Sequence, residues 1–78
     1  MTNAELLRAN GNRWRVLIYD GRNRELRDVV FVRAPSRERA ERLALQVSVV
    51  RGGRFADAKP YDARRGEMWR RGLIRYVT

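Results

Sequence analysis

The residues of this sequence that are best suited to chemistry are its arginines. Lysine and arginine number 18 against nine aspartates and glutamates, which gives a net charge of +9, and 17 of the 18 cations are arginine. A guanidinium group makes planar, bidentate contacts with phosphates or carboxylates. A GC-rich genome would also favour arginine codons, which explains the shortage of lysine but not the net charge. The composition therefore favours nucleic acid, a ribonucleoprotein or an acidic protein surface as the partner.

The densest group of arginines lies near the C-terminus. Five of them fall between residues 64 and 75, where Glu67 is the single acidic residue, and Trp69 lies among them. A tryptophan flanked by arginines is typical of an interface anchor, although Trp69 could equally pack in the core beside Met68. We predict that the partner binds here, at Arg64, Arg65, Trp69, Arg70, Arg71 and Arg75.

A second candidate surface is the sheet face that is expected to point away from the long helix. Aromatic rings and arginines alternate there, at Arg15, Tyr19, Arg27, Phe31 and Arg33. Such surfaces commonly bind single-stranded nucleic acid, because stacking a base on an aromatic ring contributes about 1 to 3 kcal/mol. Leu17 and Val29 share this face and need shelter from water. The N-terminal helix or a second copy of the chain could provide it, so a homodimer is one expected arrangement.

Few catalytic groups are present. The sequence has no cysteine and no histidine, which excludes disulfides, zinc sites and thiol or imidazole catalysis. Asp57, Asp62 and Glu67 could hold Mg²⁺, but arginines surround them and no phosphate-binding glycine motif accompanies them. We expect a non-enzymatic protein that uses no metal and no cofactor.

A small α+β domain must position these residues. The 78 residues suffice for a single domain, 1–78. The patterning predicts a four-stranded, mainly antiparallel sheet with one long helix packed on one face. The expected order is short helix, strand, strand, long helix, strand, strand. The strands are expected at 13–20, 25–34, 54–61 and 73–77, and the short helix follows Thr2.

The long helix has clear boundary signals. Ser36 is placed to cap its N-terminus, and the glycines at 52 and 53 are suited to ending it. Ala40, Leu43, Ala44 and Val47 recur at the spacing of one helix face. We therefore expect these four residues to pack on the sheet.

No apolar run approaches the roughly 18 residues of a membrane span. The first residues also lack the basic and hydrophobic regions of a signal peptide. We expect no membrane contact and a cytoplasmic location in the host cell.

One segment carries a resemblance to known proteins. The run Val32-Arg33-Ala34-Pro35-Ser36, followed by Ala40, Leu43 and Ala44 and set between hairpins, resembles the plan of several small phage and mobile-element proteins. Some anti-CRISPR proteins that act on type I systems are among them. The resemblance is architectural and covers roughly Trp14 to Tyr61. It implies an inhibitor that binds the RNA-guided Cas surveillance complex and keeps target DNA from engaging it.

The positive charge departs from the acidic, DNA-mimicking members of that group. It would suit acidic protein surfaces of a Cas ribonucleoprotein, its guide RNA, or DNA itself. We therefore expect a phage-type binding protein that acts as an anti-CRISPR-like inhibitor. The alternative is a stand-alone basic module that binds DNA or RNA directly. A regulatory or structural phage protein without nucleic-acid contact is a third reading.

Overall fold

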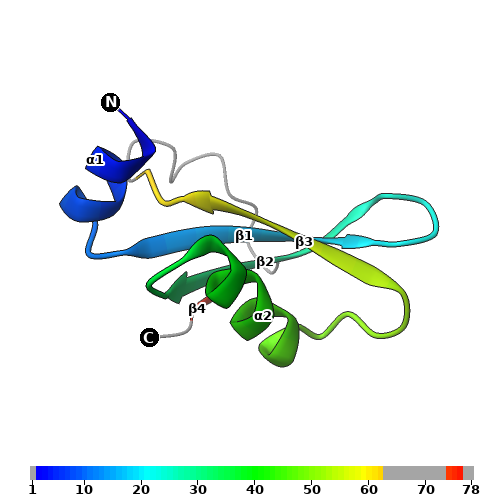
Figure 1. The fold of residues 1–78 in the computed structure, drawn as a ribbon. Coiled ribbons are helices and arrows are strands. Elements are labelled where there is room, and N and C mark those ends of the chain that lie inside the picture. Colours follow the sequence, from blue (N-terminus) through cyan, green and yellow to red (C-terminus); the bar gives the residue numbers. More distant parts are fainter. Residues whose placement is uncertain (1, 63–73, 77–78) are drawn as a thin grey trace.

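Three strands form an antiparallel sheet in this computed structural model, which describes residues 2–62 and the backbone of residues 74–76 (Figure 1). The central strand β1 (Arg13–Asp20) pairs with β2 (Leu26–Arg33) on one side and with β3 (Arg54–Pro60) on the other. A short segment, β4 (Ile74–Tyr76), adds to the outer edge of β2 in parallel. Two helices complete the described chain, α1 (Asn3–Ala9) and α2 (Arg37–Val47).

The expected α+β class is confirmed, but the expected architecture is wrong. The antiparallel part of the sheet has three strands rather than four, because β4 joins β2 in parallel. The two helices are the expected short one and α2, which has 11 residues and ends earlier than expected. Of the expected last strand, only residues 74–76 are described, and they run parallel to β2. This final pairing joins residues about 45 positions apart, so local sequence patterning does not specify its direction.

The core lies between the sheet and α2. Side chains alternate between the two faces of a strand, so Trp14, Val16 and Ile18 all point toward the helix and are buried. Val16 lies opposite Val30 in β2 and Ala58 in β3, which places the three strands in one packed layer. The buried cluster consists of Trp14, Val16, Ile18, Val30, Val32, Ala34, Ala40, Ala44 and Ala58.

Helix α2 lies across this face of the sheet (Figure 1) and begins as predicted. The Ser36 side chain accepts a hydrogen bond from the backbone N–H of Arg39 at 3.3 Å, as an N-cap residue does. Ala40 and Ala44 are buried, as expected for a packing face. Val47 is 39% exposed, so its predicted core position is wrong.

The end of α2 also differs from the prediction, because a buried polar contact stops the helix at Val47. The Ser48 hydroxyl donates to Asp28 Oδ2 at 2.9 Å, and the backbone N–H of Val49 donates to the same oxygen at 3.3 Å. Both Asp28 and Ser48 are buried. Ser48 is extended (ψ 145°), so the chain leaves the helix here, before the glycines that were expected to end it.

Helix α1 lies at the end of the sheet where β1 begins (Figure 1). Thr2 caps it by accepting from the Glu5 N–H at 3.2 Å, and Leu7 packs against the core cluster. The Asn10 side chain donates to the carbonyl of Tyr61 at 3.1 Å. These contacts hold the short helix against the sheet, which a two-turn helix needs in order to persist.

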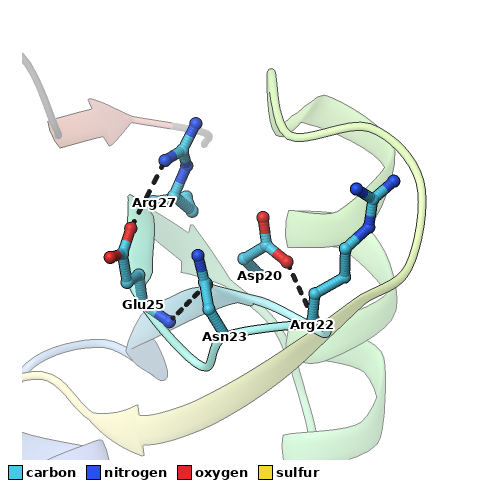
Figure 2. Close-up of polar contacts among 5 residues, drawn as sticks. All are labelled: Asp20, Arg22, Asn23, Glu25 and Arg27. Atoms are coloured by element: carbon cyan, nitrogen blue, oxygen red, sulfur yellow. Dashed lines mark hydrogen bonds and ion pairs between the residues drawn. The ribbon is translucent and has the colours of Figure 1, made fainter.

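The hairpin between β1 and β2 is a five-residue turn held by side-chain contacts to the backbone (Figure 2). Asp20 Oδ1 accepts from the Arg22 N–H at 2.8 Å, and Asn23 Oδ1 accepts from the Glu25 N–H at 3.1 Å. The Gly21 N–H donates to the carbonyl of Gly53 at 2.8 Å. The hairpin is thereby joined to the loop between α2 and β3.

Neither α1 nor α2 is long and apolar enough to cross a membrane, and these are the helices of the described residues.

Candidate functional site

The predicted partner-binding segment lies almost wholly outside the described residues. Arg64, Arg65, Trp69, Arg70 and Arg71 all fall in the range 63–73. Arg75 is in β4, where its backbone lies opposite Val30 of β2. Binding by this segment stays a prediction.

The second predicted surface does not form a single row of rings and arginines. Phe31 is 8% exposed, and its ring meets Tyr61 edge to face at 5.3 Å. Tyr19, near the other end of β1, instead stacks on Phe55 with ring centroids 5.0 Å apart and an interplanar angle of 16°. The two predicted rings therefore have different partners, and the buried Phe31 offers no open face to a base in this conformation.

The three arginines of that surface are also placed differently from one another. Arg15 is half-buried, on the face of β1 opposite the core. Arg27 is exposed and pairs with Glu25 at 3.6 Å (Figure 2). Arg33 is exposed at the end of β2. Arg15 lies opposite Phe31 in the strand register, and Arg33 is two residues further along β2, whereas Tyr19 and Arg27 lie toward the other end of the two strands.

An exposed apolar row replaces the predicted one. Phe55 of β3 and Leu26 of β2 lie opposite Tyr19 in the strand register, and their side chains are 41% and 42% exposed. Sequence reasoning missed Phe55, because only the pairing of β3 with β1 places it beside Tyr19. Val29 and Phe31 are buried within one chain, so the case for a homodimer rests on this row. The homodimer stays a prediction, which sedimentation equilibrium would check.

The carboxylates of residues 2–62 are largely engaged within the fold. Asp28 accepts from Ser48, and Glu41 Oε2 accepts from the backbone N–H of Ala58 at 3.1 Å. Asp20 accepts from a turn N–H. Lys59 and Asp57 form an ion pair at 3.7 Å, and Arg27 and Glu25 form a separate one. Most of these acidic groups thus contact the backbone, a hydroxyl group or a nearby cation, and only Glu25 is paired with an arginine among the described residues.

Many arginines remain exposed without a carboxylate partner among the residues that the structure describes. They come from both helices, the strand ends and the loops: Arg8, Arg13, Arg22, Arg24, Arg33, Arg39, Arg42 and Arg51. Glu38 and Arg42 have the spacing of a helical ion pair, yet no such pair forms. The positive charge of the sequence is therefore presented outward by the fold.

Three of these arginines line one cavity. It has a volume of about 290 Å³ and lies where the end of β2 leads into α2. We call it the arginine groove, and it is lined by Arg33, Ala34, Pro35, Arg39, Arg42, Leu43 and Gln46. The four helical residues are spaced at i, i+3, i+4 and i+7, so one side of α2 forms the wall. No acidic residue contributes to the lining.

A second cavity of about 210 Å³ lies between α1 and the edge of β3. It too contains cations, namely Arg15, Arg37 and Lys59, but Asp62 also lines it. Arg37 Nε already donates to the carbonyl of Ala58 at 3.0 Å, and Lys59 is paired with Asp57. Two of its cations thus already have partners within the fold, unlike those of the arginine groove.

Within residues 2–62 and 74–76, no group of three or more carboxylates is placed to hold a metal ion. Asp57, which the sequence offered as a ligand, is paired with Lys59 instead.

Comparisons with known proteins add no relative: no family model matches the chain, and no curated protein or solved structure matches it.

Proposed function

We propose that this chain is a small non-enzymatic protein that binds nucleic acid, alone or within a ribonucleoprotein. The observation that carries the proposal is the set of exposed arginines without carboxylate partners in residues 2–62. Nucleic acid offers a dense array of phosphates, and each cation that meets one releases condensed counterions. Because none of these arginines is paired with a described carboxylate, their guanidinium groups are available to a polyanion.

Direct binding measurements test the proposal. The full chain is titrated against fluorescent single-stranded RNA, single-stranded DNA and duplex DNA, and against a polyglutamate peptide of equal charge. We expect nucleic-acid binding that weakens steeply between 50 and 200 mM salt, as counterion release requires. The peptide should bind more weakly at the same salt concentration. Absence of binding to every nucleic acid at 50 mM salt would overturn the proposal.

A narrower candidate is an anti-CRISPR-like inhibitor that acts in the cytoplasm of the host cell. It is supported by the architectural resemblance of the strand-serine-helix segment, Val32 to Ala44. In this version the chain binds a Cas surveillance complex and blocks target DNA from engaging it. A pull-down from cells that carry a type I CRISPR system should recover Cas subunits at salt concentrations that release bulk RNA and DNA. Recovery of bulk nucleic acid alone would leave only the stand-alone module.

A further inference from the structure

The arginine groove combines charge with an apolar floor. Ala34 is buried, Leu43 is half-buried and packs against the core, and Pro35 lies between the strand and the helix. Arg33, Arg39 and Arg42 line the same groove as these apolar residues, which we call its apolar floor. Ligand pockets are generally of this kind, with an apolar lining and a few polar groups that fix orientation. At about 290 Å³ the groove is slightly smaller than their usual range, about 300 to 1,000 Å³.

The guanidinium groups of the groove form no hydrogen bond or ion pair with the described residues. None of the three arginines pairs with a described carboxylate, and none of their side chains makes a hydrogen bond recorded within the described chain. In contrast, Arg37 and Arg54 each donate to backbone carbonyls. Three exposed cations held near one another repel, so the binding of an anion between them would be favourable. Removing Arg39 and Arg42 would break no contact seen in the structure.

We propose that the arginine groove binds the phosphodiester backbone of single-stranded nucleic acid, with a sugar or an unstacked base resting on its apolar floor. This inference rests on the proposed function and assigns its binding site. A duplex keeps its bases stacked inside and presents mainly phosphates, which would leave the floor of Ala34, Pro35 and Leu43 without an apolar partner. A single strand supplies both parts at once.

Two variants of equal charge test this assignment. Arg39→Gln/Arg42→Gln removes two groove cations and keeps good helix formers in α2. Arg22→Gln/Arg51→Gln removes two exposed arginines that line neither cavity and whose side chains form no hydrogen bond or ion pair with the described residues. Each variant is titrated with a fluorescent 12-nucleotide poly(dT) strand and with a 12-base-pair duplex over a range of salt concentrations. Thermal melts confirm that both variants fold.

The groove variant should bind the single strand at least about tenfold more weakly than the wild type, because two charge-assisted contacts are lost. Its log-log salt slope should also fall by about 1.4, since each phosphate contributes about 0.7 on a single strand. The control variant should lose much less affinity. Equal losses in the two variants would overturn the groove, because they would indicate a diffuse field.

Two further results would overturn the inference in other ways. Tighter wild-type binding to the duplex than to the strand would contradict the role of the apolar floor. Binding of a polyglutamate peptide at least as tight as that of the strand would contradict the preference for nucleic acid and indicate an acidic protein as the partner. If the wild type binds no nucleic acid at all, the proposed function itself fails.

A measurement on the wild-type chain covers the case in which the groove variant does not fold. In a nuclear magnetic resonance titration with the same strand, the side-chain Nε–H signals of Arg39 and Arg42 should shift first. Signals of Arg22 and Arg51 should shift less. The reverse pattern would overturn the assignment.

Discussion

Gly21 lies where two loops meet. Its N–H donates to the carbonyl oxygen of Gly53 at 2.8 Å, and a Cβ atom built on Gly21 would lie 2.9 Å from that same oxygen. Real Cβ atoms essentially never approach backbone so closely. A Cβ built on Gly53, in contrast, would meet nothing within 4 Å. The two glycines are thus unequal, although they touch each other.

We predict that Gly21→Ala lowers the free energy of unfolding by about 1 to 3 kcal/mol. The new Cβ atom would clash with the carbonyl group of Gly53, which is backbone and cannot rotate away as a side chain could. Gly53→Ala is the matched control and should change it by less than about 0.5 kcal/mol. Urea denaturation followed by circular dichroism measures both. Equal effects would show that the β1–β2 hairpin and the α2–β3 loop do not meet as described.

At the scale of elements, α2 protects part of the edge of β3. This strand pairs with β1 on one side, and two side chains of α2 satisfy the outward backbone groups of Ala58 on the other. Arg37 Nε donates to the Ala58 carbonyl at 3.0 Å, and Glu41 Oε2 accepts from its N–H at 3.1 Å. Unpaired edges invite pairing with other chains. The helix here takes the place of a neighbouring strand.

Glu41→Ala should therefore cost about 1 kcal/mol of stability and speed hydrogen exchange at the Ala58 amide. Glu38→Ala is the matched control on the same helix, since the exposed Glu38 side chain makes no described hydrogen bond. Nuclear magnetic resonance follows the exchange of that single amide in both variants. Identical protection would mean that Glu41 does not hold the edge.

The charge of the whole molecule also affects its own stability. With a net charge of +9 on 78 residues, the compact state brings like charges together, and their repulsion favours unfolding. Salt screens this repulsion, because the Debye length falls to about 10 Å at 0.1 M.

We expect the urea midpoint to rise between 20 and 300 mM sodium chloride. The Arg22→Gln/Arg51→Gln variant should show a smaller rise, because its net charge is lower by two. A midpoint that falls with salt would show that attractive pairs, such as Glu25 with Arg27 and Asp57 with Lys59, outweigh the net repulsion.

The sequence by itself determined the features that depend on near neighbours. Thr2 and Ser36 each cap a helix by accepting a hydrogen bond from the backbone N–H three residues later, as their spacing predicted. Trp14, Val16 and Ile18 alternate inward because the strand period is two residues. The α+β class follows from these local patterns, and so does the excess of arginine. They carry information within a few positions, so no knowledge of the fold is needed to interpret them.

The tertiary structure alone decided the features that join distant residues. Helix α2 ends just before Ser48 because the Ser48 hydroxyl donates a hydrogen bond to Asp28, which is 20 positions earlier in the sequence. Tyr19 stacks on Phe55, and Phe31 meets Tyr61, because the strand register brings those rings together. The arginine groove likewise needs the end of β2 beside the wall of α2. The position of a residue within a strand or helix determines the face on which its side chain lies, but the partner on that face depends on how the elements pack.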